Sequence, residues 1–549
     1  MVEVAVDPPA ERFNFARHVF ELNAKRADKT AYIDDGIDAS GESAGAMTYG
    51  ELQSRARRVA SALRASGIRR EDRVLLLMQD CNDWPVSFLG ALYAGVIPVA
   101  VNTMLTASDY AFMLANSRSQ AVLVSANLLP VLRTAMAEAP HELHTIIVSR
   151  PAAGATSDTD IAGTTDTDAQ PFEAWIAEQV PMAQAADTMA DDVAFWLYSS
   201  GSTGRPKATV HAHGSLYWTA ELYAKPVLGL TKHDVTFSAA KLFFAYGLGN
   251  ALTFPLSVGA TVVLMAERPT PEACFKRLGN PIVAHRPTVF FGAPTGFAGM
   301  LASPNLPARD QVALRMCSSA GEALPRDIGE RFTMHFGCNI IDGIGSTEML
   351  HIFLSNRPGD VRYGTTGKPV AGYEIELRDE NGRVIADANA VGDLYIQGPS
   401  SALMYWGNRS KSRDTFQGPW TRSGDKYYRD DDGYYVYAGR SDDMLRVSGQ
   451  YVSPFEVEST LMEHPAVLEA AVIGVPDENG LTRAKAYVVL KSLDVDVAAA
   501  GLADELKAFV KSRLAPVKYP REIEFVTELP KTATGKIQRF KLRERANPS

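Results

Sequence analysis

One segment decides the fold expected of this chain: Tyr198-Ser199-Ser200-Gly201-Ser202-Thr203-Gly204-Arg205-Pro206-Lys207. It follows an apolar run, Val193 to Leu197, that predicts a buried strand. The segment combines backbone N–H groups, hydroxyls and one cation, which are the groups that hold a phosphate beyond a strand. A Gly/Ser stretch alone is often a flexible polar turn. The preceding strand and Lys207 favour a phosphate-binding loop instead.

This loop differs from a Walker A loop, in which Gly directly precedes Lys and Ser or Thr follows it. Here Pro206 precedes Lys207 and Ala208 follows it. The sequence therefore excludes the ordinary P-loop GTPases and ATPases.

Length and charge limit the remaining classes of protein. The chain has 549 residues, of which 46% are hydrophobic, so two or more domains are expected. The formal net charge of -9 argues against binding to a nucleic acid, because no basic stripe is present to neutralise a phosphate backbone. Anionic small molecules must therefore meet local positive groups.

Cysteine usage and the apolar runs indicate the compartment. The four cysteines lack the spacing of a zinc site or a disulfide scaffold, and a reducing cytoplasm is expected: Cys81, Cys274, Cys317 and Cys338. The stretch Met1 to Ala10 is acidic and unlike a secretory signal. The run Val86 to Val101 is shorter than the ~20 residues of a membrane span and is broken by Gly and Pro, so no membrane association is expected.

Alternating hydrophobic patterns predict an α/β fold. Residues Tyr49 to Ser66 have a helical pattern, and Pro151 to Gln170 read as a solvated loop. We expect a large N-terminal domain of packed mixed sheets flanked by helices. Its strands are expected at Arg73 to Met78, Ala121 to Ser125, Thr261 to Leu264 and Thr288 to Phe291.

A second unit is predicted at the C-terminal end. A helix is expected from Ser453, with strands at Ala470 to Gly474 and Ala486 to Leu490. The sequence therefore divides into a large domain, residues 1–441, and a small α/β domain, residues 442–549.

The phosphate loop resembles the signature loop of the acyl-adenylate-forming superfamily, which includes acyl-CoA synthetases, peptide-synthetase adenylation domains and firefly luciferase. Further motifs of that family follow in order and cover most of the chain. They resemble the adenine turn, a second nucleotide motif, the ribose turn, the hinge, the pantetheine-side loop and the catalytic lysine loop: Ser319 to Ala323, Asp342 to Glu348, Ser423 to Asp425, Gly439 to Asp442, Gly449 to Glu456 and Pro530 to Lys536.

The resemblance implies that the chain uses ATP, Mg²⁺ and coenzyme A. AMP transfer to a carboxylate makes its oxygen a leaving group, after which a thiol attacks the acyl carbon. Two anions must first meet, so cations and donors are needed around the α-phosphate. The implied catalytic residues are Lys207, Thr347, Glu348 and Lys536, and Glu348 is the implied Mg²⁺ ligand.

The resemblance also implies a set of nucleotide contacts, together with a hinge at Asp442 about which the small C-terminal domain is mobile. Asp425 is suited to the ribose hydroxyls because a carboxylate only accepts hydrogen bonds. The implied cofactor-binding residues are Ser199, Ser200, Gly201, Ser202, Thr203, Gly204, Gly321, Glu322, Ala323, Asp342, Ile344, Asp425, Arg440, Ser448 and Gly449.

The acid is expected to be aromatic. The run Lys241 to Gly249 lies where the family builds its acyl pocket, and Gly345 leaves room for a ring. The stretch Gly343 to Ile352 resembles that of benzoate-CoA ligases, in which the residues at His351 and Ile352 close the far wall. The implied substrate-binding residues are Phe244, Ala245, Tyr246, Ala320, Gly345, His351, Ile352 and Lys536.

Some positions depart from the superfamily pattern, and two other functions stay open. Ile344 replaces an aromatic that stacks on adenine, Phe244 replaces a histidine, and Ala208 replaces a glycine. One alternative is a stand-alone enzyme that loads an aryl acid onto a carrier-protein thiol. The other is a non-catalytic protein that binds an acyl nucleotide. The tolerated ring substituents and a homodimer also remain open.

Overall fold

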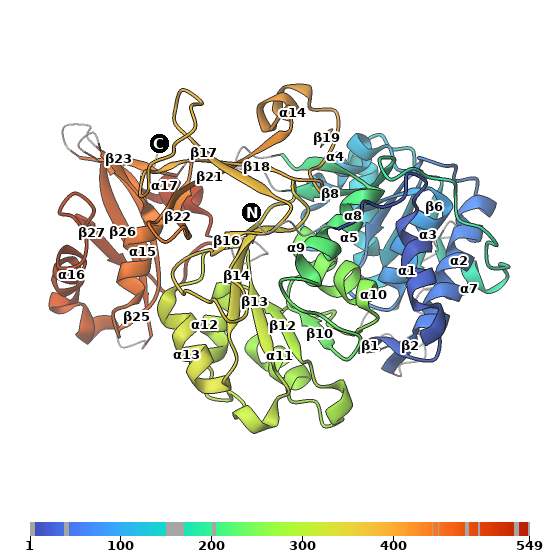
Figure 1. Ribbon diagram of the computed structural model, residues 1–549, viewed down its shortest axis with the longest axis horizontal. Coiled ribbons are helices and arrows are strands. Elements are labelled where there is room, and N and C mark those ends of the chain that lie inside the picture. The colour runs from blue at the N-terminus through green and yellow to red at the C-terminus, as the bar shows by residue number, and fades with distance from the viewer. Residues whose placement is uncertain are drawn as a thin grey trace.

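The computed structural model describes residues 6–37, 43–149, 169–199, 205–441, 443–447, 450–477, 482–491, 495–531 and 537–546. Within them the chain forms two large mixed sheets, a smaller sheet beside them and a separate C-terminal sheet (Figure 1). The predicted α/β class is confirmed. No helix in these ranges is long and apolar enough to cross a membrane.

One large sheet has nine strands and is parallel from β14 to β1. The strands of its middle are apolar and buried, as expected for a parallel sheet that is covered on both faces. In spatial order they are β16 (Lys368–Pro369), β15 (Ile352–Ser355), β14 (Ile340–Gly345), β13 (Met316–Ser319), β12 (Val289–Gly292), β10 (Val235–Ser238), β11 (Thr261–Leu264), β1 (Thr30–Ile37) and β2 (Ser43–Thr48).

The other large sheet has eight strands, and its two strands at one edge, β19 and β9, run antiparallel to their neighbours. In spatial order they are β19 (Met404–Tyr405), β9 (Lys207–Ala212), β8 (Val193–Ser199), β4 (Ile97–Ala100), β3 (Arg73–Leu77), β5 (Ala121–Ser125), β6 (Thr145–Ser149) and β7 (Ala169–Pro171). The last strand corrects the predicted loop at 151–170, because Ala169 and Gln170 pair with β6.

The three smaller sheets carry the ribose turn and the C-terminal unit. The five-stranded sheet is antiparallel: β17 (Glu374–Arg378), β18 (Gly392–Gln397), β21 (Trp420–Arg429), β20 (Phe416–Gln417) and β22 (Tyr435–Arg440). Beyond it lie a hairpin, β23 (Leu445–Val447) and β24 (Gln450–Val452), and a three-stranded sheet, β25 (Val467–Pro476), β26 (Thr482–Leu490) and β27 (Glu522–Phe525).

Helices cover these sheets. In the large N-terminal part they are α1 (Phe15–Asn23), α2 (Tyr49–Ala65), α3 (Asp83–Ala94), α4 (Ala107–Ser117), α5 (Leu129–Glu138), α7 (Phe172–Ala177), α8 (His213–Thr219), α9 (Ala245–Leu248), α10 (Phe254–Val258), α11 (Pro271–Leu278), α12 (Pro294–Ala302), α13 (Arg326–Phe336) and α14 (Arg409–Thr415). The C-terminal part contains α15 (Pro454–Met462), α16 (Val495–Lys511) and α17 (Arg539–Ala546). The segments η3 (Ala220–Ala224) and η4 (Gly249–Thr253) are π-helical, and η1 (Ala24–Arg26), η2 (Ala126–Leu128), η5 (Val283–His285) and η6 (Arg309–Gln311) are 3₁₀ turns.

The hydrophobic clusters show how the layers are joined. One large cluster combines side chains of α1, α2 and α3 with strands of both large sheets. The C-terminal strands and helices pack around clusters made of their own residues. In Figure 1 this segment, coloured orange to red, lies at the opposite end of the molecule from the first helices. The predicted boundary at 441/442 stays a prediction, since Asp442 lies outside the described residues.

The contact between α2 and α3 requires a glycine. A Cβ atom at Gly90 of α3 would lie 2.7 Å from the Ala56 carbonyl oxygen and from Val59 of α2. That distance is shorter than any normal contact, so a methyl group there would push the two buried helices apart.

We therefore predict that Gly90→Ala lowers the free energy of unfolding by about 1–3 kcal/mol. Urea unfolding followed by circular dichroism would measure the change. Gly296→Ala is the matched control, because no atom lies within 4 Å of a Cβ at that helical position. The control should be neutral or slightly stabilising. Equal stability of the two variants would contradict the packing account.

Candidate active site

The candidate phosphate loop is bracketed by paired strands. Ser199 ends β8 and pairs with Lys207, the first residue of β9. Antiparallel pairing therefore brings the first hydroxyl and the cation of the loop side by side. The Ser199 hydroxyl is buried and has no hydrogen-bond partner among the described residues. Ser200, Gly201, Ser202, Thr203 and Gly204 lie outside the described residues.

The second nucleotide motif forms the turn between β14 and β15, residues 346–351, which we call the catalytic turn. The Ser346 hydroxyl accepts a hydrogen bond from the Met349 N–H at 3.2 Å. Leu350 is buried and has a φ of 65°, a left-handed conformation that costs energy for a branched side chain. The turn is therefore a tight, strained structure that neighbouring contacts must hold in place.

Those contacts come from the edge of the eight-stranded sheet. The Tyr405 hydroxyl of β19 donates to Glu348 Oε1 at 2.6 Å, and the Ala402 N–H donates to the Glu348 carbonyl at 2.7 Å. His211 Nε2 of β9 donates to the Thr347 carbonyl at 2.8 Å. The edge of one sheet thus fixes the catalytic turn of the other.

Lys207 lies over the ring of Tyr405, the tyrosine that bonds Glu348. Its ammonium is 4.8 Å from the centroid of the Tyr405 ring. Burial lowers the pKa of Lys207, the carboxylate of Glu348 raises it, and Arg440 lowers it further. Of the predicted catalytic residues, Lys207, Thr347 and Glu348 are therefore brought together. Lys536 lies outside the described residues.

The predicted ribose contacts, Asp425 and Arg440, pair with each other. Arg440 Nη1 of β22 donates to Asp425 Oδ1 of β21 at 3.1 Å, and the two residues are cross-strand neighbours. Gly424 before them has a φ of 79°. The carboxylate is largely buried, whereas the guanidinium remains partly exposed. A nucleotide that binds here would meet both groups at once.

The predicted adenine turn follows β13. Gly321 has a φ of 99° and is exposed, which lets the chain turn sharply between β13 and α13. Beneath it, Asp342 is buried and one of its carboxylate oxygens has no partner among the described residues. Burial raises the pKa of Asp342 well above its usual range. A protonated carboxyl keeps a carbonyl oxygen that accepts, so Asp342 fits an amino donor like that of adenine.

The predicted acyl residues surround His351. Tyr246 packs against His351 with ring centroids 5.4 Å apart, and its hydroxyl donates to Ser318 at 3.1 Å. His351 and Ile352 are buried, whereas Phe244, Ala245, Tyr246 and Gly345 are half-buried. A ring bound here would meet the half-buried set first, with His351 behind it. Ala320 is buried beside Ser319 at the end of β13.

Gly345 has a role that the sequence did not predict. A Cβ atom at this position would lie 2.6 Å from the backbone carbon and oxygen of His351. The glycine therefore permits the close approach of the two ends of the catalytic turn, in addition to any space that it leaves for a substrate.

Several predicted residues cannot be placed. Asp442, Ser448, Gly449 and Lys536 lie outside the described residues. Within the described ranges, no group of three or more His, Cys, Asp or Glu side chains could hold a metal ion. A magnesium ion at Glu348 would therefore take its other ligands from phosphates and water, as Mg²⁺ usually does beside nucleotides. Among the described side chains, Tyr405 donates to Oε1 of Glu348, so Oε2 could bind such an ion.

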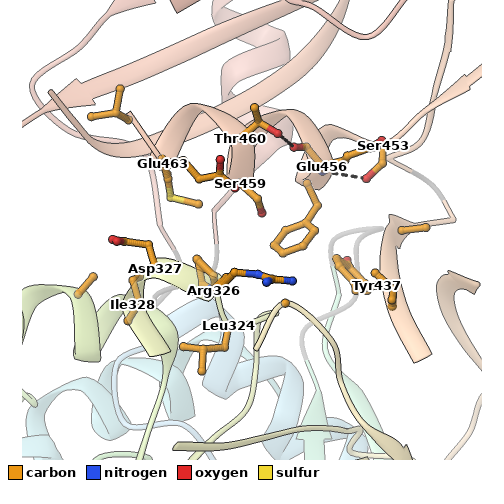
Figure 2. Close-up of a pocket in the computed structure, with 18 of the residues that line it drawn as sticks. Leu324, Arg326, Asp327, Ile328, Tyr437, Ser453, Glu456, Ser459, Thr460 and Glu463 are labelled. Carbon is orange, nitrogen blue, oxygen red and sulfur yellow. Dashed lines mark hydrogen bonds between the residues drawn. The ribbon is translucent and has the colours of Figure 1, made fainter. Parts of the chain in front are cut away.

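A cavity of about 750 Å³ separates the large N-terminal part from the C-terminal part. Figure 2 shows Arg326 and Asp327 of α13 facing Glu456 and Ser459 of α15 across it. Lys207, Thr347 and Glu348 do not belong to the described residues that line it. The cavity is thus a gap at the junction of the two parts, apart from the catalytic turn.

Three residues of the site were missed by sequence reasoning: His211, Tyr405 and Asn250. Each is hydrogen-bonded to a residue more than fifty positions away in the sequence, so no short motif contains both partners. The signal that was available for His211 is its place in the strand that follows the phosphate loop. Tyr405 and Asn250 had no comparable local signal.

Known proteins share this architecture. Residues 19–406 match the AMP-binding enzyme family, and residues 456–536 match the AMP-binding enzyme C-terminal domain. The chain therefore belongs to the AMP-binding enzyme family, and the predicted resemblance is confirmed.

Among its relatives is the benzoate–CoA ligase of Thauera aromatica, 55% identical over 98% of this chain and 97% of that protein. The 4-hydroxybenzoate–CoA/benzoate–CoA ligase of Rhodopseudomonas palustris is 45% identical over 98% of this chain and 95% of that protein. A crystal structure of a benzoate CoA ligase from Burkholderia xenovorans LB400 is 60% identical, with a TM-score of 0.87 over 97% of this chain and 100% of that one.

We predict that Tyr405→Phe slows adenylation about tenfold, because it removes a hydrogen bond to a charged carboxylate. The rate of acid-dependent exchange of pyrophosphate into ATP would measure the effect across a Mg²⁺ titration. Tyr363→Phe is the matched control, since that hydroxyl bonds Thr333 and the Ile340 N–H instead. An unchanged exchange rate in Tyr405→Phe would show that Glu348 does not depend on Tyr405.

Buried histidines should make stability depend on pH. Burial lowers the pKa of His211 and of His213 to about 4, and that of His351 to about 3. In the unfolded chain each histidine has a pKa of about 6.5. The unfolded state therefore binds more protons below that pH, and the free energy of unfolding falls as the pH drops from 6.5 towards 4.

We expect each of these histidines to contribute a loss of about 1–2 kcal/mol between pH 7 and pH 5. Urea titrations at both pH values would measure it. His213→Gln, which removes one such group, should reduce the difference between the two pH values by that amount. A difference as large as that of the unmodified chain would contradict the assignment.

Proposed function

We propose that this chain is an ATP-dependent, AMP-forming ligase that joins benzoate to coenzyme A. The observation that carries the proposal is the meeting of Lys207, Thr347 and Glu348 beside the Asp425–Arg440 pair. Full-length similarity to benzoate–CoA ligases supports the choice of acid.

The reaction has two steps. A carboxylate oxygen attacks the α-phosphorus of ATP, pyrophosphate leaves, and the acyl adenylate forms. The sulfur of coenzyme A then attacks the acyl carbon, the thiol proton is released, and AMP leaves. The first step is limited by repulsion between the carboxylate and the phosphates, so local positive charge lowers its barrier.

The side chains around the catalytic turn have separate roles in the first step. Lys207, the first residue of β9, supplies positive charge. Glu348 holds Mg²⁺, which neutralises phosphate charge when it is bound. Thr347 offers a hydroxyl next to the same phosphates, and His211 and Tyr405 hold the turn in place.

The nucleotide would be held from two sides. Asp425 would accept hydrogen bonds from the ribose hydroxyls, and Arg440 would donate to ribose or phosphate oxygens. The adenine would lie on the turn Gly321-Glu322-Ala323, over the buried acceptor of Asp342. Ile344 offers an apolar contact there in place of a stacking ring.

The acid would lie with its carboxylate at the catalytic turn and its ring towards Tyr246. Phe244 and Ala245 pack against the cluster that joins the two large sheets, and Tyr246 packs against the neighbouring cluster. The surroundings are therefore apolar apart from a few hydroxyl, amide and imidazole groups. That composition suits an unsubstituted aromatic ring.

The compartment and the assembly stay proposals. The four cysteines are buried free thiols, which supports a reducing cytoplasm. A homodimer stays open.

We predict that the wild-type protein converts benzoate, ATP and coenzyme A into benzoyl-CoA, AMP and pyrophosphate, measured by chromatography of the thioester.

Lys536→Ala should lose at least about a hundredfold in benzoate-dependent pyrophosphate exchange, because a cation that acts on the transition state is removed. Lys541→Ala, which changes an exposed residue of α17, is the control and should retain activity.

Other outcomes would point elsewhere. Thioester formation on a carrier protein but not on free coenzyme A would favour the carrier-loading alternative. Absence of pyrophosphate exchange with every aryl acid tested would favour a non-catalytic nucleotide-binding protein. Undiminished exchange in Lys536→Ala would remove that lysine from the chemistry.

A further inference from the structure

Asn250 is a buried amide directly behind the predicted acyl site. It is the second residue of η4, and its side chain has no exposure to solvent. Its Oδ1 accepts a hydrogen bond from His351 Nε2 at 3.2 Å. Its Nδ2 has no partner among the described residues. A buried amide costs free energy unless it is hydrogen-bonded, so core packing alone does not explain an asparagine at this position.

His351 is the group that this amide holds. Three aromatic rings surround the imidazole, with centroids 4.4 Å away for Phe254, 5.4 Å for Tyr246 and 5.6 Å for Tyr223. Aromatic packing alone does not decide between the two orientations of the imidazole that a flip about its Cβ–Cγ bond exchanges, whereas a hydrogen bond to one nitrogen does. Asn250 therefore sets which edge of His351 faces the site.

The π-helical turn makes this contact achievable. A Cβ atom on Gly249 would lie 2.3 Å from His351 Cδ2, so only glycine lets η4 approach the imidazole so closely. Gly249 thus makes room for His351, and Asn250 fixes it. The π-bulge widens the helix at this point, a feature that is common at functional sites.

The ring in front of His351 is held by a different strand. Tyr246 donates to the Ser318 hydroxyl of β13 at 3.1 Å, and burial raises the pKa of the Tyr246 hydroxyl well above its usual range. Among the described residues, the Asn250 amide therefore bonds His351 and not Tyr246.

Resting on the proposed function, we propose that Asn250 is a positioning residue that sets the acid specificity by holding His351 as a fixed wall. With its carboxylate at the catalytic turn, a benzoate ring points its para position towards this wall. A rigid wall excludes a para substituent, whereas a wall that can rotate or retreat admits it. When two substrates differ by one methyl group, that difference is enough for an apolar pocket to discriminate between them.

The test compares benzoate with 4-methylbenzoate in the full-length protein. We expect Asn250→Leu, which has a similar size and no hydrogen bond, to lower the ratio of kcat/KM for benzoate to that for 4-methylbenzoate about tenfold. Asn250→Asp, which keeps an acceptor for the imidazole N–H, should keep the ratio within about threefold of wild type.

Asn23→Leu is the matched control, since that buried amide bonds the Val19 and Leu256 carbonyls and does not contact His351. Its ratio should equal that of wild type even if its thermal stability falls. If Asn250→Leu does not fold, the smaller Asn250→Ser takes its place, with the same expected loss of discrimination.

Three outcomes would overturn the proposal: an unchanged ratio in a folded, active Asn250→Leu or Asn250→Ser protein, an equal loss of discrimination in Asn23→Leu, or a loss in Asn250→Asp as large as in Asn250→Leu. Failure of the proposed function is recognised separately, because wild-type protein would then form no benzoyl-CoA at all.

Discussion

The catalytic turn is held by the neighbouring sheet, and the arrangement of the site depends on this connection. Tyr405 and Ala402 bind Glu348, and His211 binds Thr347, so edge residues of the eight-stranded sheet anchor a turn of the nine-stranded sheet. The strain at Leu350 persists only because these contacts offset it. Lys207 begins β9, the strand that carries His211, and so the cation belongs to the same part of the sheet that holds the carboxylate.

Much of the fold could be predicted because its strands and helices carry local signals. The run at residues 121–125 was predicted as a strand with the bounds that the structure has, and the helix predicted from Tyr49 begins there behind a Thr48 capping box. The strand predicted at Thr288 begins one residue later. The predicted loop extended two residues too far, because β7 contains no strong β-forming residue and is stabilised by pairing alone.

The candidate site could be predicted only where a motif carries its residues together. Thr347 and Glu348 are adjacent in sequence, and Lys207 ends a recognisable loop. The partners that orient them are not, because hydrogen bonds such as Tyr405 to Glu348 join segments that only the tertiary fold brings together. The role of Gly345 in the close approach to the His351 backbone was hidden for the same reason.

The shortness of the catalytic turn couples two properties that are often treated as independent. His351 and Glu348 are separated by two residues, one of which is the left-handed Leu350. A replacement of His351 would therefore disturb Glu348, the proposed magnesium ligand, as well as the proposed contact with the ring. Asn250 reaches the imidazole from a different helix, so substrate range could evolve at that position while the adenylation machinery stays intact.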